Sequence, residues 1–323
     1  MRRRNTFLLA LVFILLGAYV YFFELQKGAK EKTERLLNFR EEEVAGILLN
    51  YPQQEIRLRK EVLGRWKITH PLESAADEST VSAILAALNT GEVKRTFEGK
   101  PSEADLKNYG LDRPEVKVLI TLRNGVALPP IFVGAKTPVG NSAYIRRGAE
   151  PGVLLTDASI RSNLEKKLND LRNKEILSVP RDQVAKLQIT TPKETLVLAK
   201  GEKDEWRVEA PKKGVAKQPV VSDYLTLLSR LRAKRFADDE AKDLKKYGLD
   251  SPAVKISAAA KDGKIVETLL VGNKTGIEYY AAREGNPTVY TIDEFSYNEL
   301  NKQLTDFLEQ EKKESPAPGK TKN

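Results

Sequence analysis

A ten-residue stretch that occurs twice constrains the fold of this chain more than any other feature of its sequence. Asp105–Pro114 reads DLKNYGLDRP and Asp243–Pro252 reads DLKKYGLDSP, so eight of the ten letters are identical. Three further pairs keep the same order and nearly the same separation. They are Trp66–Pro71 with Trp206–Pro211, Val133–Thr137 with Val271–Thr275, and Asp157–Leu171 with Asp293–Phe307. A separation that drifts by only two residues at a time indicates a duplicated domain with small loop deletions.

The repeat divides the chain of 323 residues into segments. We expect two copies of one domain, at residues 41–177 and 181–311, because a unit of this size is too long for a solenoid repeat. The junction Ser178–Arg181 is short and contains proline, which favours two domains in a fixed relation. The remaining segments are a basic flank (1–6), an uncharged run (7–23), a helical stalk (24–40) and a disordered tail (312–323).

Each copy alternates strand and helix patterns. In the first copy we expect strands at Val44–Asn50, Glu55–Lys60 and Arg65–Thr69, and further strands at Tyr144–Arg147 and Val153–Thr156. An apolar face with helical spacing follows the first three strands in both copies. Its residues are Val81, Ile84, Leu85 and Leu88, and then Val221, Tyr224, Leu225 and Leu228.

Turn and cap signals complete the reading of each copy. Asn124-Gly125 and Asp262-Gly263 predict hairpins with type I′ turns, in which both central residues have positive φ. Asp157 and Asp293 are suited to be N-caps of a final helix. The sequence therefore predicts an α+β protein, with two tandem homologous domains of antiparallel sheet and packed helices, preceded by one transmembrane helix.

The N-terminus predicts the compartment. Arg2, Arg3 and Arg4 precede the uncharged run Phe7–Phe23, which as a helix would span roughly 26 Å, near the lower limit for a bilayer core. Large apolar residues continue to Phe23, which favours an uncleaved signal anchor over a cleaved signal peptide. The positive flank stays in the cytoplasm. We expect a single-pass protein of a bacterial inner membrane, with most of the chain in the periplasm.

The repeated motif has a mechanical reading. Ser102 and Asp105 resemble a capping box that begins a short helix at Asp105–Tyr109. Gly110 suits a left-handed helix end, Leu111 can fold back, and Pro114 prevents continuation. The corresponding residues are Tyr109, Gly110, Leu111, Asp112 and Pro114 in the first copy and Tyr247, Gly248, Leu249, Asp250 and Pro252 in the second. A structural joint is favoured, and a ligand contact through the tyrosines stays open.

The composition excludes several kinds of site. The chain has no cysteine, so disulfides, thiolate metal sites and cysteine nucleophiles are excluded, and its single histidine is His70. The net charge of +9 includes the three N-terminal arginines, and this mild excess does not indicate a nucleic-acid binder. No cofactor or metal site is expected.

Four features could carry chemistry, and each has a structural alternative that we favour. The Val-Gly-x-Lys-Thr segments at 133–137 and 271–275 lack the glycine spacing of a P-loop and are read as strand-ending turns. His70 is matched by Ala210 and is read as a surface residue. The acidic run at 238–240 could hold calcium, but is read as a cap for the helix before Tyr247. Trp66 and Trp206 could stack on sugars, but their matched places favour core packing.

Two copies of the Tyr-Gly-Leu-Asp-x-Pro helix end, each followed by a hairpin and a Val-Gly-x-Lys-Thr turn behind an anchor, resemble the bacterial family called domain of unknown function 4340. The resemblance covers most of the chain after the stalk. It implies an envelope protein with an accessory role beside an ABC-type transporter, and it transfers no catalytic residue.

The expected function is that of a non-enzymatic, membrane-anchored accessory or scaffold protein whose partner is a membrane-protein complex. Two alternatives stay open. The chain could be a glycan- or lipid-binding envelope module, or a periplasmic hydrolase that uses carboxylates of a cleft between the copies. No paired-carboxylate or Ser-x-x-Lys motif supports the hydrolase.

Overall fold

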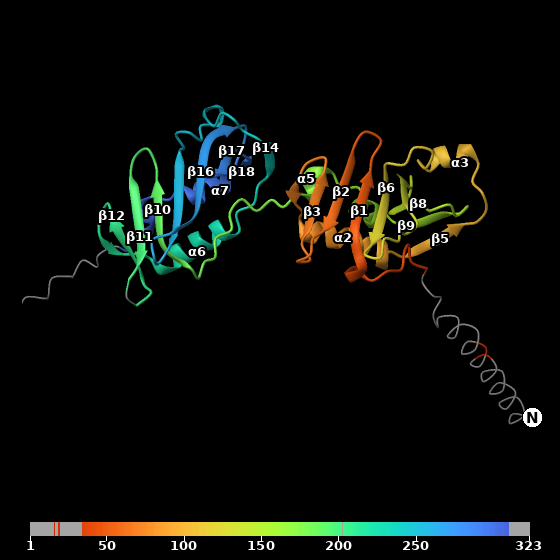
Figure 1. Ribbon diagram of the computed structural model, residues 1–323, viewed down its shortest axis with the longest axis horizontal. Helices are drawn as coiled ribbons and strands as arrows, with labels where there is room; N and C mark the ends of the chain where they lie inside the picture. The colour runs from red at the N-terminus through yellow and green to blue at the C-terminus, as the bar shows by residue number, and fades with distance from the viewer. Residues whose placement is uncertain (1–15, 17–18, 20–33, 202, 310–323) are drawn as a thin grey trace, which may run out of the picture. The chain divides into compact units, whose positions relative to one another are not determined.

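The computed structural model describes residues 16, 19, 34–201 and 203–309. The chain forms two compact units, Met1–Asn173 and Lys174–Asn323, called unit 1 and unit 2 below (Figure 1). The predicted anchor at 7–23 lies outside the described residues except for Leu16 and Tyr19, and the predicted tail at 312–323 lies outside them entirely. Within the described part of the chain, no helix has both the length and the apolar character needed to cross a membrane.

The two units have nearly the same order of elements. Unit 1 contains η2 (Glu41–Glu43), β1 (Val44–Asn50), β2 (Glu55–Lys60), β3 (Trp66–His70), β4 (Ser74–Ala75), α2 (Glu78–Thr90), β5 (Val93–Phe97), α3 (Glu103–Asn108), β6 (Val116–Leu122), β7 (Ile131–Lys136), β8 (Ser142–Arg147), β9 (Val153–Asp157), α4 (Ala158–Leu164) and α5 (Leu168–Leu171). Unit 2 contains β10 (Val184–Thr190), β11 (Thr195–Lys200), β12 (Trp206–Ala210), β13 (Gly214–Val215), α6 (Gln218–Ser229), β14 (Arg235–Asp238), η3 (Lys245–Tyr247), β15 (Val254–Ala260), β16 (Ile265–Thr275), β17 (Glu278–Arg283), β18 (Val289–Asp293), α7 (Glu294–Leu300) and α8 (Leu304–Phe307).

Each unit is built on one antiparallel sheet of nine strands. The order in unit 1 is β4-β3-β2-β1-β6-β7-β8-β9-β5, and the order in unit 2 is β13-β12-β11-β10-β15-β16-β17-β18-β14. The two orders correspond strand for strand. Figure 1 shows β1, β2 and β3 side by side in unit 1 and β10, β11 and β12 side by side in unit 2. The predicted α+β class with antiparallel sheets is confirmed, and strands outweigh helices.

The core of each unit lies between one face of the sheet and the helices. In unit 1 the predicted apolar face of α2 is buried, with exposed fractions of 0–2% for Val81, Ile84, Leu85 and Leu88. These side chains join inward residues of the strands and of α4 and α5 in one cluster. The corresponding face of α6 is buried in unit 2. Helical periodicity therefore identified the buried stripe in both copies.

The Asn-Gly and Asp-Gly hairpins form, but their predicted turn type is wrong. The Leu122 N–H donates to the Val126 carbonyl at 2.9 Å, and the Ala260 N–H donates to the Lys264 carbonyl at 2.9 Å, which closes three-residue loops. In each loop only the glycine has positive φ, +83° at Gly125 and +81° at Gly263. A type I turn followed by one left-handed glycine gives this geometry.

The predicted N-caps of the final helices are confirmed, and each is paired with a lysine. The Asp157 side chain accepts from the Ser159 N–H at 2.9 Å, and Lys94 Nζ lies 3.0 Å from its Oδ2. Hydrogen bonds from Ser159 and then from Lys94 lower the pKa of Asp157 to about 2. At Asp293 burial raises the pKa, but hydrogen bonds from Lys234 and Ser296 outweigh burial and lower it to about 2.

The described part of the predicted helical stalk is not helical. Residues 34–40 form no helix and lie against the rest of unit 1, where Leu36, Leu37 and Phe39 are 0%, 7% and 8% exposed. We call residues 34–40 the lead-in segment of unit 1. The helix-friendly composition of this stretch misled the prediction, because three apolar side chains with a place in the core override local propensity.

Unit 2 has a lead-in segment of its own at residues 174–180, which contains most of the predicted junction. The Leu36 N–H donates to the Gly91 carbonyl at 3.1 Å, and the Ile176 N–H donates to the Leu231 carbonyl at 3.2 Å, exactly 140 residues later in both partners. Ile176, Leu177 and Val179 are buried in the core of unit 2. Each copy of the repeat therefore begins with its lead-in segment, earlier than the predicted boundaries.

Candidate functional site

The repeated motif forms a Schellman helix end in unit 1. Ser102 and Asp105 make the predicted capping box at the start of α3. At the other end, the Leu111 N–H donates to the Leu106 carbonyl at 2.8 Å and the Gly110 N–H donates to the Lys107 carbonyl at 3.1 Å. Gly110 has φ +65°, and this pair of bonds around a left-handed residue defines the Schellman motif.

The second copy keeps the end of the helix and shortens its body. The predicted helix before Tyr247 is a single 3-10 turn, η3, because the chain there lacks a Ser102-type cap. Gly248 has φ +68°, and the Leu249 N–H donates to the Leu244 carbonyl at 3.0 Å. The part of the motif shared by both copies is therefore its left-handed turn.

The motif docks on the Val-Gly-x-Lys-Thr segment, so the two repeated motifs form one structure. We call this structure the YGLD joint. The Ala135 N–H on β7 donates to the Tyr109 carbonyl oxygen at 2.7 Å. A Cβ at Gly134 would lie 2.4 Å from that oxygen, and a Cβ at Gly272 would lie 2.2 Å from the Tyr247 carbonyl oxygen. Glycine is required where one backbone approaches another this closely.

The remaining residues of the motif lead into the next strand. Leu111 and Leu249 are 3% and 2% exposed, whereas Asp112 and Asp250 are exposed. Pro114 and Pro252 each lie two residues before the strand that follows, β6 or β15.

Tyr109, at the end of α3, lies in an aromatic cluster on the face of the sheet opposite α2, α4 and α5. Its ring centroid is 4.3 Å from that of Tyr144 and 6.0 Å from that of Phe97. Tyr144 lies on β8 between the buried residues Ala143 and Ile145, so alternation along the strand directs it to the opposite face. The Tyr109 ring is half-buried.

Tyr247 has a polar partner in the corresponding place. Its hydroxyl donates to Asp238 Oδ2 at 2.6 Å, its ring packs edge-on against Tyr280 at 4.9 Å, and the residue is 4% exposed. Asp238 pairs with Val289 on β18, as Phe97 pairs with Val153 on β9. The hydrogen bond to Asp238 raises the pKa of Tyr247. The two corresponding tyrosines therefore have different environments: Tyr109 has aromatic neighbours, and Tyr247 also has a hydrogen-bond acceptor.

The acidic run at 238–240 has a different role from the predicted one. Asp238 accepts from the Tyr247 hydroxyl and from the Glu240 N–H, and Asp243 rather than this run accepts from the Lys245 N–H at the start of η3. The predicted helix cap is therefore wrong. The described residues contain no group of three or more His, Asp or Glu side chains placed to hold a metal ion.

The two tryptophans are core residues with matched contacts. Trp66 and Trp206 are 5% and 6% exposed. Their backbone N–H groups donate to Glu78 Oε1 and Gln218 Oε1, each at 2.8 Å. A lysine Nζ lies over each ring, at 5.7 Å in unit 1 and 5.8 Å in unit 2. Rings buried to this extent are not open for stacking on a sugar. His70 is exposed at the end of β3.

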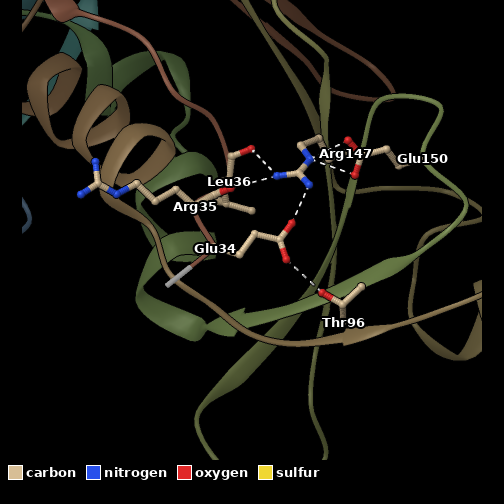
Figure 2. A network of polar contacts seen from close by, with 6 residues as sticks. All are labelled: Glu34, Arg35, Leu36, Thr96, Arg147 and Glu150. Atoms are coloured by element: carbon tan, nitrogen blue, oxygen red, sulfur yellow. Dashed lines mark hydrogen bonds and ion pairs between the residues drawn. The ribbon is translucent and has the colours of Figure 1, made fainter. Parts of the chain in front are cut away.

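The polar network around Arg147 is the site that sequence reasoning missed (Figure 2). Arg147 lies at the end of β8, and its Nη1 donates to the carbonyl oxygens of Arg35 and Leu36 at 2.9 and 3.1 Å. Its Nη2 donates to Glu34 Oε1 at 2.6 Å, and its Nε donates to Glu150 at 2.9 Å. The hydrogen bonds to Glu150 and Glu34 hold the pKa of Arg147 above its ordinary value.

The Arg147 network fixes the lead-in segment of unit 1 in two ways. The guanidinium binds the backbone carbonyls of Arg35 and Leu36 as well as the side chain of Glu34. The Leu36 side chain is fully buried. In unit 2, Lys174 stands at the position of Glu34, and Arg283 at the position of Arg147 lies 2.7 Å from Glu267. The network is therefore a feature of the copy that follows the N-terminal segment.

A sequence signal for the lead-in segments existed. Residues 34–39 read ERLLNF and residues 174–179 read KEILSV, with apolar residues in register at the separation of 140 that also relates the two tryptophans. The charge pairing of Arg147 with Glu34 had no such signal, because it joins residues that are far apart in the chain and occurs in one copy.

The fold and the joint define a class of protein: a tandem duplication of a nine-stranded antiparallel sheet whose longest helix packs on one face, each copy completed by the YGLD joint. A family model described as domain of unknown function (DUF4340) matches residues 66–242 and 206–314, and the chain belongs to this family. The suspected family is thereby confirmed. No curated protein and no solved structure matches the chain.

Proposed function

We propose that this protein is a non-enzymatic accessory or scaffold protein of the bacterial inner membrane. In this proposal residues 7–23 anchor the chain, and the two units lie in the periplasm and bind a membrane-protein complex. The resemblance described above favours an ABC-type transporter as that complex.

The observation that carries the proposal is the way in which the lead-in segment is held. The Arg147 network and three buried apolar side chains fix residues 34–40 to unit 1, in the one copy that follows the predicted anchor. Only residues 24–33 separate the fixed segment from the end of the anchor. A short tether raises the effective concentration of a domain for partners in the same membrane.

The strongest pKa perturbations among the described carboxylates have structural causes, which favours a binding role. N-cap hydrogen bonds and lysine partners lower the pKa values of Asp157 and Asp293 to about 2. Carboxylates with such low pKa values stay ionised and are poor proton donors at neutral pH. Their positions at helix starts account for the perturbation without any reaction.

Affinity isolation from detergent-solubilised membranes tests the proposal. The tagged full chain should co-purify with a membrane-protein complex, and a variant that lacks residues 174–309 should stay in the membrane and lose the complex. The full chain and the deletion variant carry the same C-terminal tag, so that both are captured in the same way. The proposal is wrong if the full chain isolates no membrane protein, or if one alanine substitution of an Asp, Glu, Ser or His abolishes function while fold, location and partner binding persist.

Topology has its own test. A reporter that is active only outside the cytoplasm, fused after residue 323, should be active, and the chain should resist extraction by alkaline washing. Recovery of a soluble species that begins near residues 24–30 would show that the N-terminal run is a cleaved signal.

A further inference from the structure

The turn between β2 and β3 in unit 1 exposes two adjacent apolar side chains. Val62 and Leu63 are 103% and 91% exposed at the tip of this hairpin. The turn is closed by backbone bonds, from the Glu61 N–H to the Arg65 carbonyl at 2.8 Å and from the Gly64 N–H to the Glu61 carbonyl at 2.9 Å. The tip is therefore ordered by its backbone, and its two apolar side chains contribute nothing to the core.

Unit 2 shows that the turn does not need apolar residues. The turn between β11 and β12 has the same closure, from the Gly201 N–H to the Glu205 carbonyl at 2.8 Å and from the Asp204 N–H to the Gly201 carbonyl at 3.1 Å. In the sequence, Glu202 and Lys203 stand at the positions that correspond to Val62 and Leu63. Since polar residues make the same hairpin, the apolar pair in unit 1 requires an explanation outside the fold.

The charges beside the two tips also differ, with an excess of cations in unit 1 only. Residues 59–67 (RKEVLGRWK) contain four cations and one carboxylate, whereas residues 199–207 (AKGEKDEWR) contain three cations and three carboxylates. Arg59 and Arg65 are exposed on either side of the apolar tip. An apolar tip flanked by cations complements an anionic bilayer, because the apolar residues enter the interface while Lys and Arg meet the headgroups.

The tip lies at the end of the sheet to which the lead-in segment comes. β2 ends beside the start of β1, with Arg59 opposite Gly46, and β3 begins opposite Lys60. The turn between β6 and β7, where Val126 is 52% exposed, lies at this same end because Leu122 pairs with Val44. The Arg147 network is also here, since Arg147 pairs with Ile131 at the start of β7.

We propose that the Val62–Leu63 tip of unit 1 inserts into the headgroup region of an anionic lipid bilayer. The bilayer is the one that holds residues 7–23, so this inference rests on the proposed membrane anchoring. Anchor and tip would then be two contacts of one unit with the same membrane. Two such contacts limit the rotation of unit 1 about its tether, and the first raises the effective concentration for the second.

The absence of cysteine from the chain allows a direct test. The full chain carrying Leu63→Cys is labelled with the environment-sensitive fluorophore NBD and reconstituted into vesicles of phosphatidylethanolamine and phosphatidylglycerol. Val139→Cys, on the 89% exposed side chain at the opposite end of the sheet of unit 1, is the matched control. Lys203→Cys labels the corresponding tip of unit 2.

The label at residue 63 should shift to shorter wavelength and be quenched by brominated lipids several times more strongly than the labels at residues 139 and 203. Val62→Ser and replacement of phosphatidylglycerol by phosphatidylcholine should each weaken this quenching. If all three labels are equally exposed to water in vesicles that retain the protein, the inference about the tip is wrong and the proposed anchoring is unaffected. Failure of the chain to float with the vesicles overturns the proposed anchoring and this inference together.

Discussion

Replacement of Gly134 by alanine tests whether the two repeated motifs form one joint. A Cβ at this position lies 2.4 Å from the Tyr109 carbonyl oxygen and 3.0 Å from the Leu111 side chain. The joint would have to move, which weakens the 2.7 Å hydrogen bond from the Ala135 N–H to the same oxygen. Overpacking costs about 1–3 kcal/mol and a lost hydrogen bond about 0.5–1.5 kcal/mol. We expect Gly134→Ala to lower the free energy of unfolding of unit 1 by about 2–4 kcal/mol.

The two buried tryptophans allow each unit to be followed separately. Trp66 reports unit 1 in a Trp206→Phe background, and Trp206 reports unit 2 in a Trp66→Phe background. Urea unfolding of the detergent-solubilised full chain, followed by tryptophan fluorescence, then gives one transition for each unit. Gly134→Ala should move the transition of unit 1 to lower urea concentration. Gly272→Ala, whose Cβ would lie 2.2 Å from the Tyr247 carbonyl oxygen, should do the same to unit 2.

Gly46→Ala is the control for a strand glycine with space around it. The atom nearest to a Cβ at Gly46 is the Leu58 carbonyl oxygen at 3.4 Å, an ordinary contact distance. This variant should change the free energy of unfolding by less than about 1 kcal/mol. If Gly134→Ala shifts the unit 1 transition no further than Gly46→Ala does, the docking of the YGLD joint does not depend on a glycine and the reasoning is refuted.

Four further variants can be measured with the same two fluorescence signals. Tyr109→Phe should be nearly silent, whereas Tyr247→Phe should destabilise unit 2 by about 1 kcal/mol because it removes the hydroxyl that donates to Asp238; equal effects would contradict this contrast. The folded-state pKa of Asp293, about 2, is below its ordinary value, so its carboxylate stabilises unit 2 above pH ~4 and this contribution is lost as the pH falls towards 2. Asp293→Asn should therefore flatten the dependence of the urea midpoint on pH in that window, and an unchanged slope would show that other groups cause it. Leu36→Ala should destabilise unit 1 by about 2–5 kcal/mol, since Leu36 is fully buried. A change below about 0.5 kcal/mol would show that residues 34–40 do not pack in the core of unit 1.

The sequence by itself determined the duplication, the class of fold and the buried face of each long helix. These features are local or periodic. Val81, Ile84, Leu85 and Leu88 are spaced for one helical face, and that face is buried wherever the helix packs. The left-handed turn at Gly110 was also readable, because its bonds join residues at most five positions apart. Local propensity failed at residues 34–40, where packing in the core prevents a helix.

Tertiary structure alone decided which distant parts of the chain meet. The pairing of β5 with β9, the docking of Tyr109 on Gly134 and the binding of Glu34 by Arg147 each join segments separated by many residues. Such contacts depend on the strand order and register, and neither is written in the local pattern of the residues involved. Phe97 and Asp238 illustrate the consequence. They occupy the same place in two copies of one sheet and give the repeated tyrosine an aromatic neighbour in one and a hydrogen-bond acceptor in the other.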